Sequence, residues 1–156
     1  MIEIEIYNPI YHEEVVELVT SIQQKEFAIP ITYEDQPDLA DIAGFFDGFW
    51  VAKYSNKLVG TIGLKIIKDF ALIRKMFVAE EFRGSVFGIG QKLLTSLEAE
   101  VSSRELSKIY LGTTEFFKAA HKFYEKNNYT EIPISNLPFE FPIMHIDTKF
   151  YLKGGV

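Results

Sequence analysis

Residues 76–91 read MFVAEEFRGSVFGIGQ, and they carry the most informative pattern in the chain. It predicts a strand that ends near Ala79, a loop that contains glycine, and a helix that begins near Ile89. The first amides of a helix have no partner within the helix and lie at the positive end of its dipole. The stretch therefore favours binding of an anion such as a pyrophosphate.

Three glycines determine how closely a ligand could approach this loop. Gly84, Gly88 and Gly90 carry no side chain, so their backbone can come near a phosphate, and Arg83 would add charge-assisted hydrogen bonds. Such turns are common, and most of them only reverse the chain. The stretch contains neither the G-x-G-x-x-G of a dinucleotide fold nor the G-K-S/T of a P-loop, which argues against both classes.

The segments before this stretch predict a strand, helices and then three antiparallel strands. Alternation over residues 2–6 favours a strand with one exposed face, and apolar residues at helical spacing favour a helix over residues 9–27. A loop over residues 28–37 leads to a short helix over residues 38–46. Two-residue connections favour antiparallel pairing of the next three strands, which we expect at residues 49–54, 57–67 and 70–79.

The segments after the loop complete a mixed α/β (α+β) pattern. An apolar residue at every fourth position predicts a helix over residues 89–101. We then expect a strand at 108–111, a helix at 116–127, an irregular loop with three prolines, and a long strand at 143–152. This order predicts one domain, residues 1–156, with a mixed central sheet of about seven strands and helices on both faces.

Composition excludes several classes of function. The 156 residues have the size of one domain, and the absence of cysteine excludes disulfides, thiolate metal sites and a cysteine nucleophile. The net charge of −6 disfavours nucleic acid and anionic lipid as partners. The N-terminus has glutamates where a signal peptide needs an apolar run, and no apolar run approaches the roughly 20 residues of a membrane span. We therefore expect a cytoplasmic protein.

Two separated blocks resemble the GNAT superfamily of N-acetyltransferases, and the resemblance covers nearly the whole chain. The first block, from Phe77 to Leu94, looks like the family's acetyl-CoA pyrophosphate loop. The second, AAHKFYEKNNY at residues 119–129, is similar to the family's A-x-x-F-Y-E-K-x-G-F segment. The resemblance implies an acetyl-CoA site that comprises Phe77, Val78, Arg83, Gly84, Ser85, Val86, Phe87, Gly88, Ile89, Gly90 and Gln91.

Three positions depart from the family pattern. Ser85 lies at the usual anchor position of the loop and Arg83 lies two residues earlier, so we interpret the loop as a longer form. Asn128 replaces the usual glycine, a mild change because asparagine tolerates the left-handed conformation. Phe117 stands where the family often has an asparagine. Which individual amides reach the phosphates is therefore left open.

The resemblance implies acetyl transfer from acetyl-CoA to a primary amine by direct attack, with no covalent enzyme intermediate and no metal. Tyr124 would be the acid that protonates the leaving thiolate, because the matching tyrosine of the family lies near the cofactor sulfur. The alternative is that Tyr124 only packs in the core. A backbone N–H near Phe77 and Val78 would stabilise the oxyanion.

The general base is not assigned by the sequence. The strand expected at residues 70–79 carries LIRKM at its centre, where some family members have a carboxylate. A water relay is one possibility. Four acidic residues on loops or helix ends could face the acceptor, although each is more often a solvated charge: Glu26, Glu34, Asp35 and Glu115.

Histidine and the C-terminal loop add little to the assignment. The three histidines are isolated from one another and have no metal-ligand spacing, and we expect His121 to be exposed on its helix. The segment LPFEFP at residues 137–142 could cover the acceptor pocket, and exposed aromatic rings there would favour an acceptor with an apolar part.

Two functions of different classes remain open at this point. The first is an enzyme that acetylates a small amine or a protein amino group, and the second is a non-catalytic acetyl-CoA sensor or interaction module. A third and weaker hypothesis is that the protein binds another nucleotide. Release of CoA thiol in the presence of amines separates the first from the second. A homodimer is compatible with the sequence, which decides neither the oligomeric state nor the acceptor.

Overall fold

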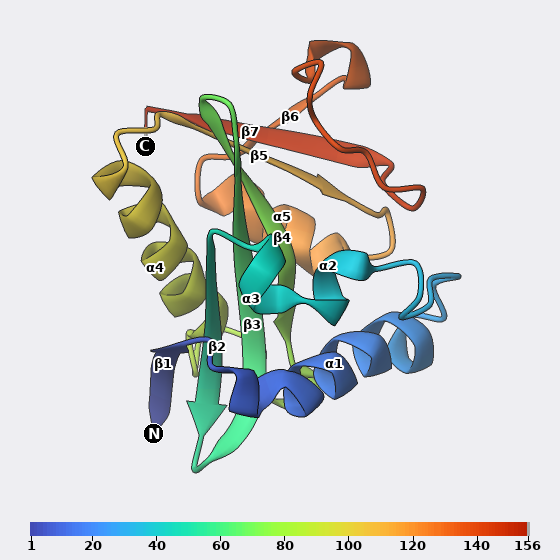
Figure 1. Cartoon of the computed structure of the whole chain (residues 1–156), viewed down its shortest axis with the longest axis vertical. Helices are drawn as coiled ribbons and strands as arrows, with labels where there is room; N and C mark the ends of the chain where they lie inside the picture. The colour runs from blue at the N-terminus through green and yellow to red at the C-terminus, as the bar shows by residue number, and fades with distance from the viewer. Residues whose placement is uncertain (156) are drawn as a thin grey trace.

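A seven-stranded mixed sheet runs through the middle of the computed structural model, which describes residues 1–155 (Figure 1). Its strand order is β1-β2-β3-β4-β5-β7-β6, and only β4 and β5 pair in parallel. The predicted mixed sheet is confirmed. The strands are β1 (Ile2–Ile6), β2 (Gly48–Tyr54), β3 (Lys57–Ile67), β4 (Phe70–Val78), β5 (Lys108–Thr113), β6 (Thr130–Ile132) and β7 (Lys149–Gly154).

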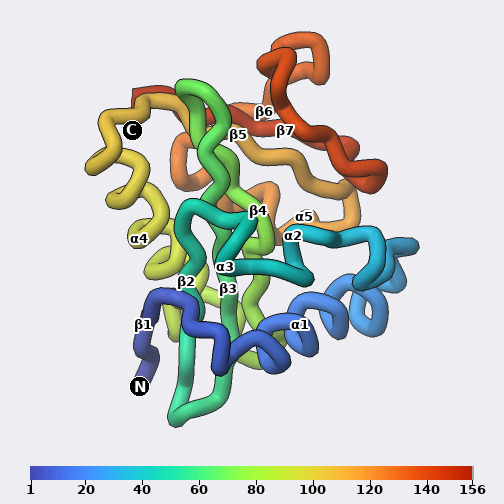
Figure 2. Tube along the Cα trace, in the orientation of Figure 1, coloured from blue at the N-terminus to red at the C-terminus, as the bar shows by residue number. Residues whose placement is uncertain are grey.

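Helices cover both faces of this sheet, as the sequence predicts (Figure 2). The cluster around Leu93 and Leu97 of α4 packs on one face, and the cluster around Val15 and Val19 of α1 packs on the other. The helices are α1 (His12–Thr20), α2 (Pro37–Ala40), α3 (Ile42–Phe45), α4 (Ile89–Ser103) and α5 (Lys118–Lys126), with the π-helix η2 (Ser21–Glu26) and the 3-10 helices η1 (Pro9–Tyr11), η3 (Glu80–Phe82) and η4 (Ile134–Asn136). No helix among residues 1–155 has the length and apolar character needed to cross a bilayer.

The strands β4 and β5 separate shortly after they meet. Their parallel pairing is limited to Ala71 with Ile109 and Leu72 with Tyr110. Beyond these pairs β5 continues along β7, while β4 stays with β3. The backbone polar groups that face the split are therefore available to something other than a neighbouring strand.

A bulge in β4 lies at this split. Lys75 has a φ of +55°, which is unusual for a residue with a side chain, and the pairing of β3 with β4 shifts register here. The hydroxyl of Thr61 donates a 2.7 Å hydrogen bond to the Lys75 carbonyl oxygen and thereby holds the bulge in place. Strain at a non-glycine residue is typical of functional sites.

Two predicted elements differ in the structure. The strand expected at residues 143–152 begins only at Lys149, because residues 144–147 form a turn in which the Met144 N–H donates to Oδ2 of Asp147 and the Asp147 N–H donates to the Met144 carbonyl. The helix expected at residues 38–46 is divided at Asp41, whose carboxylate caps the second half through the Gly44 N–H.

Candidate functional site

A cavity of about 940 Å³ opens where β4 and β5 separate. Its walls come from η2, the split ends of β4 and β5, the loop before α4, one side of α5 and the segment between β6 and β7. This volume is within the range of small-molecule and cofactor sites. The split in the sheet thus produces the main cavity of the described chain.

The N-terminus of α4 borders this cavity with free amides. Gly88 caps the helix at a φ of +62°, no side chain caps it, and among residues 1–155 the N–H groups of Ile89, Gly90 and Gln91 have no hydrogen-bond partner. Gly84 has a φ of +101° with open space where a Cβ would lie. These features fit a pyrophosphate group, because free amides, the helix dipole and an open backbone all favour it.

Arg83 already has partners in this structure. Its Nη1 and Nη2 donate to the two oxygens of Glu26 at 2.5 and 2.7 Å, and its Nε donates to the Val78 carbonyl oxygen at 2.8 Å. The guanidinium also lies over the ring of Phe27, 5.8 Å from the centroid. Arg83 therefore lines the cavity with its charge balanced by Glu26, and its expected contact with phosphate stays a prediction.

The remaining loop residues divide between the cavity and other surroundings. Phe77, Val78, Gly84, Ser85, Gly88, Gly90 and Gln91 line the cavity. Val86 is 91% exposed and Ile89 is buried in the core, while Phe87 packs on the rings of Tyr54 and Phe82. The side chains of Val86, Phe87 and Ile89 thus lie off the cavity, and a contact of these three residues with the cofactor, which would go through their backbone, stays a prediction.

Tyr124 lines the cavity from α5. Its ring is buried among Phe123, Tyr129 and Tyr151, with centroids 5.6–6.1 Å away, and its hydroxyl makes no hydrogen bond among residues 1–155. Burial raises the pKa of the Tyr124 phenol well above its ordinary value. At neutral pH the side chain is a proton donor without a protein acceptor, as a general acid requires.

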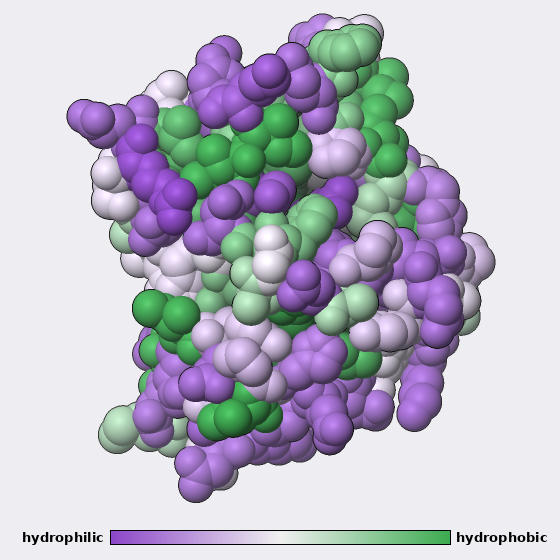
Figure 3. Space-filling model, viewed as in Figure 1, coloured by the Kyte–Doolittle hydropathy of each residue, from purple (hydrophilic) through white to green (hydrophobic). Residues whose placement is uncertain are grey.

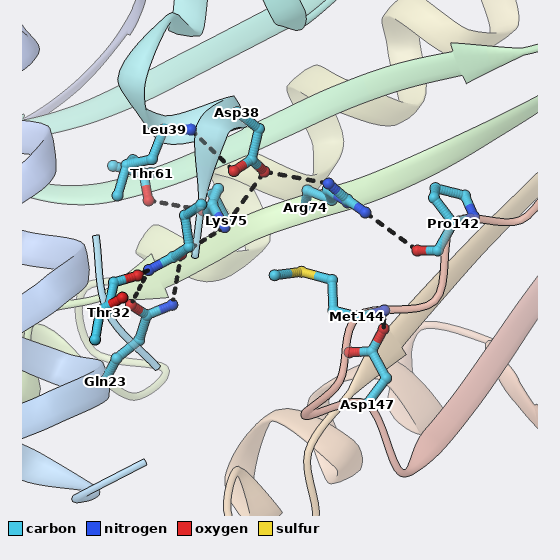
Figure 4. A network of polar contacts seen from close by, with 11 residues as sticks. Gln23, Thr32, Asp38, Leu39, Thr61, Arg74, Lys75, Pro142, Met144 and Asp147 are labelled. Carbon is cyan, nitrogen blue, oxygen red and sulfur yellow. Dashed lines mark hydrogen bonds and ion pairs between the residues drawn. The ribbon is translucent and has the colours of Figure 1, made fainter. Parts of the chain in front are cut away.

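A buried polar network lies on the β4 side of the split (Figure 4). Oδ2 of Asp38 accepts from Nη1 of Arg74 at 3.2 Å and lies 3.3 Å from Nζ of Lys75. Nη2 of Arg74 donates to the carbonyl oxygen of Pro142 at 3.2 Å. This network joins β4, α2 and the segment between β6 and β7.

Two glutamines complete the surroundings of Lys75. Nζ donates to Oε1 of Gln36 at 2.7 Å, and the amide groups of Gln36 and Gln23 donate to one another at 2.9 and 3.0 Å. Burial lowers the pKa of Lys75, and the nearby carboxylate of Asp38 opposes that shift. Sequence reasoning placed Lys75 on a strand but found no role for it, since its partners lie on other segments.

Asp147 faces this network from the other side of the split (Figure 4). Its carboxylate lies against Gly112 of β5, where a Cβ would meet Oδ2 at 2.7 Å, so only glycine leaves room for it. Oδ2 accepts from the Met144 N–H at 3.0 Å. Burial raises the pKa of Asp147, and the positive charges of Arg74, Lys75 and His145 oppose that shift.

None of the four acidic residues considered from the sequence is a free carboxylate in the cavity. Glu26 binds Arg83, and Glu34, Asp35 and Glu115 are exposed and lie outside the cavity lining. Asp147 could not be found from the sequence pattern, because residues 143–152 were expected to form a strand and the turn that carries Asp147 was not predicted.

The histidines contribute to structure rather than to the cavity. His121 is 7% exposed, and its Nε2 lies 2.8 Å from the carbonyl oxygen of Thr114, so the expectation of an exposed His121 is wrong. His12 and His145 lie beside Tyr7 and the Pro30 carbonyl. Among residues 1–155, no group of three or more histidine, aspartate or glutamate side chains could hold a metal ion.

The segment at residues 137–142 covers part of the cavity. Phe141 and Pro142 contribute to its lining, whereas Phe139 is 99% exposed. Apolar side chains gather on this segment at the upper right of the molecule (Figure 3), where Ile134 and Ile143 are also half-exposed or more. The segment thus contributes the apolar side chains of Phe141 and Pro142 to the cavity wall.

Comparison with known proteins defines the class. The sequence model described as "Acetyltransferase (GNAT) family" matches residues 12–129. A solved acetyltransferase of the GNAT family from Staphylococcus aureus is 37% identical, with a TM-score of 0.94 and 99% of each chain covered. The PaiA N-acetyltransferase from Thermoplasma acidophilum, solved with coenzyme A, shares the fold with a TM-score of 0.76, 18% identity and 99% of each chain covered.

The chain therefore shares its fold with these transferases over nearly its whole length. The chain belongs to the acetyltransferase (GNAT) family. A mouse relative, the probable N-acetyltransferase family 8 member 5, is 29% identical over an alignment of 131 residues that covers 74% of this chain and 57% of that protein. The chain spans between 36% and 57% of the length of the curated relatives it matches.

Proposed function

We propose that residues 1–156 act as one domain that transfers an acetyl group from acetyl-CoA to a primary amine of a small molecule or a protein. One observation carries the proposal: a single cavity is lined by the free amides of α4, by the unpaired phenol of Tyr124 and by ionisable groups at the split of the sheet. This combination joins an anion site to an acid and a candidate base, which acyl transfer to an amine needs.

The residues of the cavity have separate roles in this proposal. The amides of Ile89, Gly90 and Gln91 hold the pyrophosphate, and backbone near Phe77 and Val78 supports the oxyanion. Acetyl-CoA supplies the acetyl thioester. Overall one nitrogen–carbon bond forms and one carbon–sulfur bond breaks, while the ammonium nitrogen gives up two protons. One proton reaches solvent, and the sulfur receives one through Tyr124.

Two measurements test the proposal. Acetyl-CoA and CoA should raise the melting temperature of the chain, whereas ATP and NAD should not. A ligand at 100 times its Kd adds about 2.7 kcal/mol to the free energy of unfolding. Release of CoA thiol across a panel of amines then tests turnover. If neither CoA species shifts the melting temperature, the proposed site is wrong.

The same measurements separate the enzyme from a non-catalytic sensor. Tight binding of acetyl-CoA without thiol release for any amine would support the sensor and contradict the enzyme. The free phenol of Tyr124 and the carboxylate of Asp147 in one cavity favour the enzyme. The cytoplasmic location and the homodimer considered from the sequence remain predictions.

A further inference from the structure

Arg74 and Asp147 lie on opposite sides of the split at the same level. Leu72 and Tyr110 form the last pair of β4 and β5, and both belong to one apolar cluster on one face of the sheet. Side chains alternate along strands, so the residue two positions later on each strand lies on that same face. On β4 that residue is Arg74, and on β5 it is Gly112, against which the carboxylate of Asp147 lies.

The β4 side carries an excess of positive charge. Arg74 and Lys75 share the one carboxylate of Asp38, with contacts of 3.2 and 3.3 Å. Both residues contribute to the lining of the cavity, but Nζ of Lys75 donates to Gln36 and its side chain is only 4% exposed, whereas the side chain of Arg74 retains 16% exposure. The guanidinium of Arg74 is always charged and has only a share in the carboxylate of Asp38, so in a partly buried site an anionic ligand group would be drawn to it.

The β5 side offers a negative charge that remains without a cationic partner. Among residues 1–155, Asp147 forms no ion pair within 4.0 Å. Its Oδ2 accepts from the Met144 N–H, and its Oδ1 has no hydrogen-bond donor in the described chain. Arg74 and Asp147 thus both line the cavity, and among residues 1–155 they form no ion pair with each other within 4.0 Å.

We propose that the acceptor is a primary amine that also carries a carboxylate, as an amino acid does. Its carboxylate binds the guanidinium of Arg74, and its amino group binds the carboxylate of Asp147. Such a ligand satisfies both sides of the split at once. This inference rests on the proposed function and names the acceptor class of that same site.

Asp147 then also prepares the amine for attack. The acceptor's ammonium group donates a proton to Oδ1 of Asp147, which leaves a neutral nitrogen with a free electron pair, and Asp147 later releases that proton to solvent. The raised pKa of Asp147 suits this exchange, because a more basic carboxylate removes a proton more readily. Leu72, Phe141 and Met144 line the same region and provide apolar contacts for the rest of the acceptor.

Matched substrates test the inference on the native chain. Each amino acid of a panel is compared with its own carboxamide, which has the same shape but no negative charge, and CoA thiol release is measured for both. The amino group of the carboxamide loses its proton more readily, so intrinsic reactivity favours the amide. We expect kcat/KM to be about 10- to 100-fold higher for the free acid, as for a charge-assisted hydrogen bond. A series of ω-amino acids with matched alkylamines then measures the spacing between the two charges.

A variant of Arg74 tests whether this residue causes the preference for the free acid over its carboxamide. Arg74→Gln should bring the acid-to-amide ratio to within about 3-fold of one, because only the acid has an ion pair with residue 74 to lose. Arg104→Gln is the matched control, since Arg104 lies at the C-terminal end of α4 and pairs with Glu100 outside the cavity. It should keep the native ratio. If Arg74→Gln does not fold, the acid-to-amide ratio of the native chain decides alone.

The outcomes distinguish this inference from the proposed function. Amides that are acetylated as fast as acids by the native chain would overturn the inference and keep the proposed function. An Arg74→Gln variant that lowers both series equally would also overturn it, since Arg74 would then be structural. Absence of thiol release with every amine would contradict the proposed function, and the inference with it.

Discussion

The cavity has two ends that differ in how they are built. The proposed cofactor end is one continuous stretch, residues 83–91, and the groups proposed to bind there are backbone amides at the start of α4. The proposed acceptor end joins Arg74, Asp38 and Asp147, which lie on three separate segments. Backbone sites depend on local geometry, whereas side-chain sites depend on topology. The first can be altered by a local change, and the second depends on every segment that supports it.

The largest effect should come from the acceptor end. Asp147→Asn removes the proposed proton acceptor but retains an oxygen that can accept from the Met144 N–H. We expect kcat/KM to fall about 10²- to 10³-fold, as for loss of a general base, with CoA affinity unchanged. In the native chain the rate should fall as the pH drops through the raised pKa of Asp147. The rate of the variant should not show this decrease at low pH. Arg74, Lys75 and His145 face Asp147, and none of them is changed.

Asp147→Asn should not destabilise the fold at pH 7, although it lowers the rate. A carboxyl group whose folded-state pKa is raised stabilises the fold at low pH, and this contribution is lost as the pH rises through that pKa. At pH 7 the native fold therefore contains a costly buried charge, and Asp147→Asn should not lower the melting temperature. Asp35→Asn is the control, because hydrogen bonds from Thr32 lower the pKa of Asp35. That variant should lose a little stability and keep its rate.

Tyr124→Phe tests the residue proposed to protonate the sulfur of the leaving CoA. The substitution removes only the hydroxyl and keeps the ring packed among Tyr129 and Tyr151. If the phenol protonates the leaving sulfur, turnover should fall about 10²-fold with little change in CoA affinity. Tyr129→Phe is a matched control, since its hydroxyl binds Glu98 instead. A loss of stability at unchanged rate would make Tyr124 a packing residue.

Sequence patterns predicted the parts of this molecule that are determined locally. The turn at residues 55–56 follows from a two-residue connection between alternating strands, and Ser55 and Asn56 both have the positive φ that tight hairpins favour. The loop and helix from Arg83 onward were likewise predicted, because glycine positions and helical periodicity are local signals. These features need no knowledge of distant segments.

Features that depend on distant partners were not predicted. Residues 143–148 alternate like a strand, but Asp147 turns back on Met144, and its carboxylate finds room only because residue 112 on β5 is a glycine. In the sequence, Arg74 and Lys75 are two cations on a strand, and only the fold places Asp38 of α2 beside them. His121 is buried because the Thr114 carbonyl lies opposite its ring. Each of these contacts exists only in the folded chain.

Two glycines separate the ends of the cavity experimentally. Gly90→Val places a side chain beside Met76 and Phe123 at the cofactor end, and we expect the Kd for CoA to rise about 10-fold with the acceptor KM unchanged. Gly112→Ala displaces the carboxylate of Asp147, so the acceptor kcat/KM should fall about 10-fold with the CoA Kd unchanged. Gly88 is less suitable, because its φ of +62° makes any substitution strained. Equal effects of both variants on both ligands would contradict two separate ends.

The smallest effect concerns the charge of Arg83. Glu26→Gln removes the carboxylate that balances this guanidinium, so Arg83 becomes free to meet a phosphate. Both side chains are partly exposed, at 33% and 23%, which limits the gain, and we expect CoA to bind about 2- to 5-fold more tightly at low salt. Screening should remove this gain at high salt. Glu131→Gln breaks a comparable ion pair with Lys149 away from the cavity and should leave the Kd unchanged. If Glu26→Gln lowers the melting temperature without changing the Kd, Arg83 serves only to tie η2 to the end of β4, and the cofactor end relies on backbone amides alone.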